Sequence, residues 1–213
     1  MNRRTFLTSA GTSALIAPFA FACTKNNGGS NSNGIDLGSG DVGVLNYFFT
    51  LAQLQAAFYV QLVKTPYTNA TADEISLLTD IRDHAIGYSG FYNTILSITA
   101  IGQLKFDFSG IDFSDRESVL NAAKTFEDLI VSAYNGAAKL FSSADYLQVA
   151  AKIASVEARH AAYIRDLLSY GSFADATIVD MNGLDVVNDT SSVLNTIAPF
   201  LLIKLDASHL PTN

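Results

Sequence analysis

The chain has 213 residues with 20 acidic and 13 basic side chains, which gives a formal net charge of −7. A surface this acidic argues against nucleic acid as a partner and against electrostatic docking on anionic lipid, and it is compatible with cation binding. The length suffices for one domain with a substantial core. Cys23 is the single cysteine, so no internal disulfide can form.

The first 22 residues are predicted to be an export signal. Arg3 and Arg4 are followed by Phe6 and Leu7, which resembles the core of the twin-arginine signal. The apolar run behind them is too short for a comfortable membrane span. The alternative is an ordinary secretory signal that happens to contain Arg-Arg. Without this segment, which holds two basic residues and no acid, the net charge would be 11 − 20 = −9.

Cys23 follows Ala20-Phe21-Ala22, which resembles a bacterial lipobox, in which the cysteine is acylated and becomes the mature N-terminus. Phe21 is unusual at the middle position, and the alternative is cleavage nearby that leaves a free thiol. Residues 23–40 are rich in Gly, Ser and Asn, which predicts a flexible tether. We therefore expect an exported, periplasmic protein that is held at a membrane by lipid on Cys23.

Two helices are predicted in the first half of the folded part, because apolar residues recur there at steps of three and four in one stripe. The first is expected from about residue 42 to 64, after Asp41 as its N-cap. The second is expected to begin at a capping box made by Thr71 and Glu74 and to reach about residue 100.

Two further helices are predicted after a long connection that contains Phe106 and Phe108. The third is expected to begin at a capping box of Ser114 and Glu117, and the fourth is expected to run from about 144 to 170 and to end at Gly171. Four helices of matched length predict an all-α antiparallel four-helix bundle over residues 41–171, with a long crossover between the second and third helices. Residues 172–213 are expected to form a tail whose short helix packs on the bundle.

The third and fourth helices carry the residues that suggest chemistry. Glu127 lies on the third, and Glu157 and His160 lie three residues apart on the fourth. Positions i and i+3 share a helix face. Carboxylate-bridged di-iron bundles use this Glu-x-x-His spacing on two of their four helices and a single Glu on each of the other two.

The chain also reads as a doubled helical hairpin, and the first half lacks these residues. Ala52 and Ala85 stand 75 and 72 residues before the two glutamates, and Tyr88 stands three residues after Ala85. The first half thus carries Ala and then Ala-x-x-Tyr where the second half carries Glu and then Glu-x-x-His.

The chain resembles the exported ferritin-like domain family, which also contains the plant desiccation-related proteins. The resemblance covers roughly residues 41–205 and rests on the segments LNYFFTLAQLQAAFY, IRDHAIGYSGF, FDF, FEDLIVSAYNGAAKL and IASVEARHAAYIRDLL. It implies a ferritin-like fold with a degenerate di-iron site that keeps Glu127, Glu157 and His160. It also implies that Ala52, Ala85 and Tyr88 stand at the lost ligand positions, and that Gln55 stands where relatives often have a second Glu.

Three states of this residual half-site are considered, and the third is a two-metal centre, which would lack the bridging carboxylate at Ala85. In the first, two carboxylates and one imidazole bind a single Fe²⁺, Mn²⁺ or Zn²⁺. In the second, no metal binds, and His160 with neighbouring donors offsets the cost of two buried carboxylates. The candidate donors are Gln55, Tyr59, Tyr88, Arg82 and Tyr134. His84 is expected to be a boundary or surface residue and not a ligand, because it points about 100° away from Ala85 on the helix.

We therefore expect a lipid-anchored bundle that has lost half of its di-iron ligands and acts as a non-catalytic structural or interaction protein without a cofactor. The alternative is a metal-binding ferritin-like protein with one Fe, Mn or Zn ion and an oxidoreductase or iron-handling role. A homodimer is compatible with either function, and the sequence indicates no specific protein partner.

Overall fold

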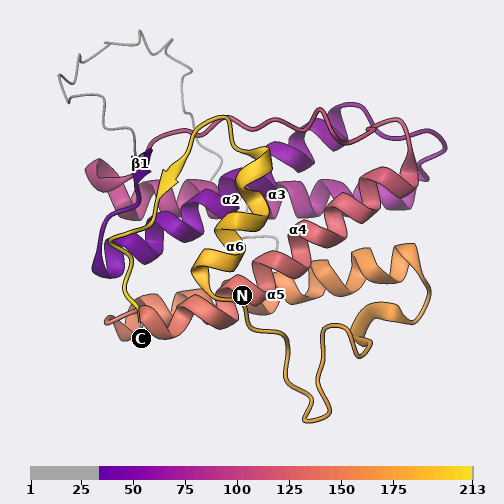
Figure 1. Cartoon of the computed structure of the whole chain (residues 1–213). Helices are drawn as coiled ribbons and strands as arrows, with labels where there is room; N and C mark the ends of the chain where they lie inside the picture. Colours follow the sequence, from indigo (N-terminus) through magenta and orange to yellow (C-terminus); the bar gives the residue numbers. More distant parts are fainter. Residues whose placement is uncertain (1–33, 213) are drawn as a thin grey trace, which may run out of the picture. The chain divides into compact units, whose positions relative to one another are not determined.

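The computed structural model describes residues 34–212 (Figure 1). The predicted export signal with Arg3, Arg4, Phe6 and Leu7, the predicted lipidation site Cys23 and the first part of the predicted tether therefore lie outside the described residues. The described elements are β1 (Ile35–Asp36), α2 (Gly40–Lys64), α3 (Ala72–Leu96), η1 (Ser97–Thr99), α4 (Arg116–Ala137), η2 (Ala138–Leu140), α5 (Ala144–Leu168), η3 (Ser172–Ala174), α6 (Thr190–Ile197), η4 (Ala198–Phe200) and β2 (Leu205–Asp206).

The four long helices form two packed pairs, α2 with α3 and α4 with α5. The connection from α3 to α4 runs along the upper side of the molecule in Figure 1, and α6 lies across α4. This arrangement confirms the predicted all-α four-helix bundle with a long crossover between its second and third long helices. Among residues 34–212, no helix combines the length and the apolar character needed to cross a membrane.

α2 is the central helix of the bundle, and 16 of its 25 residues are buried. A helix that is buried all round needs partners on more than one face. The single apolar stripe predicted for this segment therefore accounts for only part of its packing. The crossover covers a second face, where the Phe58 ring lies 5.8 Å from that of Phe108 and 5.7 Å from that of Phe113, measured between centroids.

Two buried amides on α2 hold the crossover in place. The Asn46 side chain donates to a main-chain carbonyl oxygen at 3.0 Å and accepts from a main-chain N–H at 3.1 Å. The Gln53 side chain likewise donates to a main-chain carbonyl oxygen at 3.0 Å and accepts from a main-chain N–H at 2.8 Å. All four partners belong to residues 99–104, so these side chains satisfy backbone groups that would otherwise be buried without partners.

The start of α3 confirms the predicted capping box. The Glu74 N–H donates to the Thr71 hydroxyl oxygen at 3.2 Å, and the Thr71 N–H donates to the Glu74 carboxylate at 3.0 Å. The other carboxylate oxygen of Glu74 accepts from Arg116 at the start of α4, at 2.6 Å. One residue therefore caps α3 and ties it to α4.

The predicted N-cap of α2 is wrong. The cap residue is Ser39, and Asp41 lies in the first turn of the helix. The carboxylate of Asp41 instead accepts from the main-chain N–H groups of Ser142 and Ser143, at 2.6 and 3.1 Å. Asp41 therefore satisfies backbone groups just before α5, which is a contact between segments far apart in the sequence.

The predicted capping box of α4 is wrong by one residue. Asp115 is the N-cap, and its carboxylate accepts from the Ser118 N–H at 2.7 Å. The Ser114 hydroxyl donates to Asp112 at 2.6 Å. The carboxylate one residue later therefore takes the N-cap role that the sequence predicts for Ser114.

The end of the predicted tether belongs to the folded domain. β1 pairs in parallel with β2, with Ile35 opposite Leu205, and Leu37 is fully buried. The tether prediction is therefore wrong for residues 35–37. The short helix in the tail is α6, which buries Val193 and Ile197 completely.

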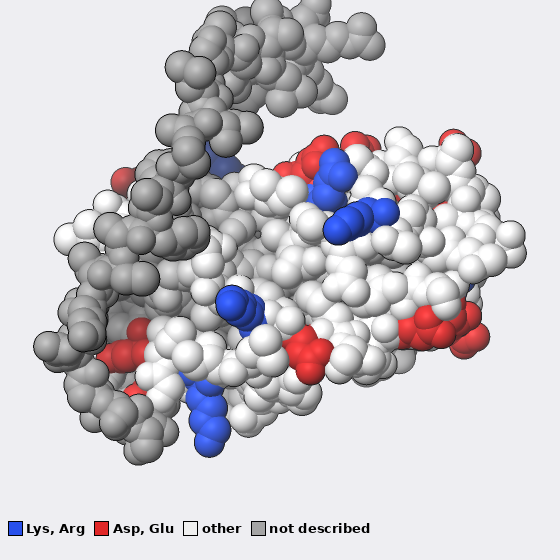
Figure 2. Space-filling model, turned by 90° about the horizontal axis from the view of Figure 1, so that it is seen from above, with Lys and Arg blue, Asp and Glu red and all other residues white. Residues whose placement is uncertain are grey.

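The predicted surface charge can be followed on one face of the molecule. In the part of Figure 2 that belongs to the described residues, acidic and basic side chains are scattered among uncharged ones. A basic track of the kind that follows a nucleic-acid backbone is not seen on that face.

Candidate metal centre

The structure brings Glu127 of α4 together with Glu157 and His160 of α5. One donor atom from each of the three side chains lies within 4.8 Å of the other two. Nδ1 of His160 lies 3.1 Å from Oε2 of Glu157 and 3.7 Å from Oε2 of Glu127. The glutamates are 0% and 1% exposed, so both carboxyl groups lie in the interior of the bundle.

Gln55 of α2 links the two carboxyl groups. Its Nε2 donates to both oxygens of Glu127 at 3.1 Å and to Oε2 of Glu157 at 2.7 Å. Hydrogen bonds to a charged acceptor are stronger than neutral ones. One amide therefore offsets part of the cost of burying both acids, which is the role predicted for Gln55 in a metal-free cluster.

Burial dominates the electrostatics of this group. Burial, followed by the negative charge of Glu157, raises the pKa of Glu127 above its usual range. Burial likewise raises the pKa of Glu157, and it lowers the pKa of the His160 imidazole. Two carboxyl groups that face one another in a dry site resist carrying two negative charges, whereas a cation between them favours the ionised forms.

His84 of α3 contacts the side of the His160 ring that faces away from the carboxyl groups. Its Nδ1 lies 3.0 Å from Nε2 of His160. His84 is exposed, as expected for a boundary residue, but the sequence pattern did not predict its contact with His160. The sequence feature that could have indicated this contact is the position of His84 next to Ala85. An imidazole one residue away from the predicted ligand face is long enough to contact a side chain on that face.

Two of the predicted donors do not reach the carboxyl groups. Arg82 instead bonds its neighbour Asp83 through Nε at 2.9 Å and Nη2 at 2.7 Å. The Tyr134 hydroxyl shares a hydrogen bond of 2.7 Å with the Tyr92 hydroxyl. The predictions for Arg82 and Tyr134 are therefore wrong, because Arg82 bonds the adjacent residue of α3 and Tyr134 of α4 bonds Tyr92 of α3.

Two tyrosines lie near the site without bonding it. The Tyr59 hydroxyl is buried and makes no hydrogen bond to the described residues. Burial and then the charge of Glu127 raise the pKa of Tyr59, and burial and then the charges of Glu157 and Glu127 raise that of Tyr88. Tyr59 is thus an unpartnered polar group that a ligand of the site, or water bound to an ion, would satisfy.

The three side chains fit one metal ion. In a tetrahedral site, metal–oxygen and metal–nitrogen bonds of about 2.0–2.2 Å place neighbouring ligand atoms about 3.3–3.6 Å apart. The contacts of His160 Nδ1 at 3.1 and 3.7 Å are close to that spacing. An ion there requires the Gln55 amide to move aside or to turn its oxygen inward. A second ion would lack ligands from Ala52 and Ala85, which are buried and carry no donor atom.

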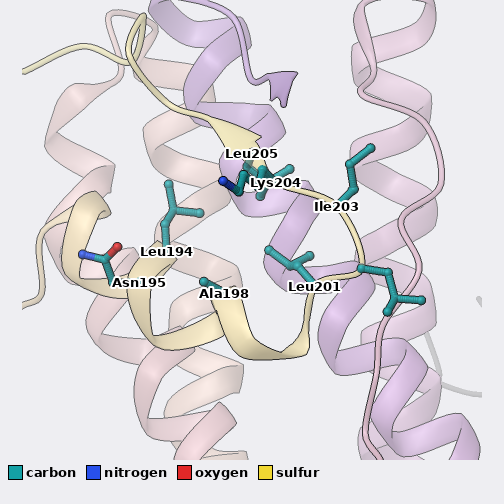
Figure 3. A pocket seen from close by; sticks show the side chains of 8 residues that line it. Leu194, Asn195, Ala198, Leu201, Ile203, Lys204 and Leu205 are labelled. Carbon is teal, nitrogen blue, oxygen red and sulfur yellow. The ribbon is translucent and has the colours of Figure 1, made fainter. Parts of the chain in front are cut away.

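A different cavity lies between α6 and the segment that leads into β2 (Figure 3). Its volume is about 460 Å³. Its lining includes no acid and no histidine, and consists of Leu194, Asn195, Ala198, Leu201, Leu202, Ile203, Lys204 and Leu205. None of these residues belongs to the group of Glu127, Glu157 and His160. Among the described residues, the candidate metal ligands therefore lie in the bundle interior and not in this cavity.

The comparisons with known proteins identify a family for most of the described chain. No curated protein matches the chain. Residues 40–170 match the sequence model of the ferritin-like domain. The matched span runs from the start of α2 to just beyond the end of α5, and so includes Gln55, Glu127, Glu157 and His160.

Proposed function

This chain belongs to the ferritin-like domain family, and we propose that it is a metal-binding bundle that holds one divalent transition-metal ion between α4 and α5. The observation that carries the proposal is the buried group of Glu127, Glu157 and His160, with donor atoms within 4.8 Å of one another. Two carboxylates and one imidazole suit Fe²⁺, Mn²⁺ or Zn²⁺. When bound, the ion would act as a Lewis acid toward water or a small oxygen ligand.

The proposal is for one ion and not for a di-iron enzyme. Ala52, Ala85 and Tyr88 supply no carboxylate and no imidazole from the first helical hairpin. Oxygen activation in carboxylate-bridged bundles uses a pair of irons held from both hairpins. The remaining half-site therefore supports metal storage, transfer or structural use more directly than oxidation.

The second candidate is a metal-free structural or interaction protein. The Gln55 amide favours it, because it already donates to three carboxylate oxygens at 2.7–3.1 Å. In this case the raised pKa values of Glu127 and Glu157 let the pair carry less than two negative charges. The same cluster would then stabilise the centre of the bundle without a cofactor.

We also propose that the protein lies outside the cytoplasm on a lipid anchor, as a monomer or as a homodimer. Support comes from the sequence around Arg3 and Arg4 and from Cys23 behind Ala20-Phe21-Ala22. Labelling of cells with a tagged fatty acid tests it. Label on the wild-type chain that is absent from Cys23→Ser is expected, and label on neither chain contradicts the anchor.

Metal content tests the function. The purified chain is stripped with chelator, equilibrated with Fe²⁺, Mn²⁺ or Zn²⁺, freed of loose metal and analysed for bound ions. One ion per chain, lost in the isosteric variant Glu157→Gln, is the expected result. A wild-type chain that retains no metal favours the second candidate, and two ions per chain contradict the assignment of a half-site.

A further inference from the structure

The contact between His84 and His160 has the geometry of an in-plane hydrogen bond. Nδ1 of His84 and Nε2 of His160 are 3.0 Å apart, while the ring centroids are 5.1 Å apart. The ring planes differ by 11°. The two rings are therefore nearly parallel and meet edge to edge at their nitrogens, which is the arrangement in which one ring N–H points at the lone pair of the other.

This contact is part of a continuous chain of polar groups from the surface to the interior. His84 is exposed on α3, and its ring contacts Nε2 of His160. The other ring nitrogen of His160 lies 3.1 Å from Glu157, which in turn accepts from Gln55. Both nitrogens of His160 are therefore engaged, one toward the proposed ligand group and one toward His84.

The proton position on His160 decides whether its ring can bind a metal. A neutral imidazole carries one N–H and one lone pair, and a metal ligand must present the lone pair. For Nδ1 of His160 to face the ion, the proton must sit on Nε2, where Nδ1 of His84 accepts it. In the metal-free protein, Nδ1 of His160 can instead donate to Glu157, and His84 then donates to Nε2. Because an imidazole can donate or accept, His84 matches both states.

We propose that His84 is a positioning residue that holds the His160 ring in the orientation and tautomer required for metal binding through Nδ1. The inference rests on the proposed metal-binding function, which it deepens by assigning the outer partner of the ligating histidine. Ligating histidines in metalloproteins generally donate their second ring N–H to such an outer acceptor, and loss of that acceptor typically costs about 10–100-fold in metal affinity or activity.

The test compares His84→Ala with His84→Asn in the full chain. The asparagine keeps a hydrogen-bonding atom near the place of Nδ1, and the alanine removes it. Zn²⁺ affinity is measured by competition with a chelating dye at about pH 8, where imidazoles with ordinary pKa values are neutral. Affinity is expected to fall about 10–100-fold in His84→Ala and to recover largely in His84→Asn. The matched control is His209→Ala, which removes an exposed histidine that pairs with Asp36 far along the chain and is expected to leave affinity unchanged.

A second readout separates positioning from a general loss of structure. The nitrogen chemical shifts of the His160 ring in the Zn²⁺-loaded and metal-free proteins report its tautomer directly. Loaded wild-type protein is expected to show the proton on Nε2, and metal-free His84→Ala is expected to show a shifted mixture of tautomers relative to the wild type.

The outcomes distinguish this inference from the function on which it rests. Equal Zn²⁺ affinity and equal His160 shifts in wild type and His84→Ala overturn the positioning role and leave metal binding intact. No Zn²⁺ binding by the wild-type chain overturns the proposed function itself. Equal loss of affinity in His84→Ala and His84→Asn, with unchanged His160 shifts, also contradicts the role assigned to the hydrogen bond.

Discussion

Replacing Gln55 with glutamate is expected to have opposite effects on the metal-free and metal-loaded protein. In the wild type, Nε2 of Gln55 donates to Glu127 at 3.1 Å and to Glu157 at 2.7 Å. A hydrogen bond to a charged group contributes about 1.5–3 kcal/mol. Loss of one such bond for each carboxyl group would therefore cost about 3–6 kcal/mol, and a third acid in the same dry site adds repulsion.

Protonation limits that cost in the metal-free protein. Each unit by which a carboxyl pKa rises costs about 1.4 kcal/mol, and a proton retained in the cluster restores a donor. We therefore expect Gln55→Glu to lower the free energy of unfolding by about 3–5 kcal/mol at pH 8 and by less at pH 5. Urea unfolding in chelator, followed by helical circular dichroism, measures this difference.

A divalent ion reverses the sign of the effect, because the new carboxylate becomes a ligand. Affinity for Zn²⁺ or Mn²⁺ is expected to rise at least about 10-fold, and saturating metal is expected to recover the lost stability by mass action. Gln55→Leu is the matched control, because it removes the donor without adding a ligand. If Gln55→Glu unfolds like the wild type in chelator and gains no metal affinity, the contacts assigned to this cluster are wrong.

Two further predictions concern the bundle. Gly136→Ala is expected to lower the free energy of unfolding by about 1–3 kcal/mol, because a Cβ there would collide with the main chain before α6. Gly87→Ala lies in open space on α3 and is expected to raise it by about 0.5–1 kcal/mol. Urea unfolding of both variants measures the difference. Burial raises the pKa of Glu74, but hydrogen bonds from the Thr71 backbone and from Arg116 outweigh it and hold the pKa below its usual range. The folded state then binds fewer protons than the unfolded state at acid pH. The stability that the Glu74 contacts contribute is therefore present above about pH 4.3 and is lost as the pH falls further. An acid titration of thermal stability is expected to be shallower for Glu74→Gln, and an unchanged acid limb contradicts the role of this contact.

The correct predictions were those that rest on periodic patterns in the sequence. Steps of three and four residues predicted the long helices, and the spacing of Glu157 and His160 predicted that both face the same side. Glu127 joined them because the resemblance to ferritin-like proteins implied a ligand at its position on the third long helix. Such patterns assign a residue to a helix face, and the packing of the helices then brings residues on facing sides into contact.

The sequence did not predict how far individual side chains reach. Arg82 lies on nearly the expected face, but its charged end bonds the adjacent Asp83. His84 lies one step off that face, but its ring spans the gap to His160. Periodicity carries no information on the rotamer of a long or planar side chain, which depends on neighbours from other helices.

Long-range pairing was also beyond the sequence patterns. The buried Leu37 follows a two-residue strand that pairs with residues 205–206, and composition alone placed this segment in a tether. The Gly, Ser and Asn residues around it indicate local freedom. They do not report the partner strand supplied by the other end of the chain.

Anomalous diffraction from crystals of the chain soaked in Zn²⁺ tests the central claim most directly. Data collected on both sides of the zinc absorption edge locate the ion without reference to the protein. The account predicts one peak per chain, about 2.0–2.2 Å from an oxygen of Glu127, an oxygen of Glu157 and Nδ1 of His160. A bundle interior without a peak, or a peak on the Nε2 side of His160, would contradict it.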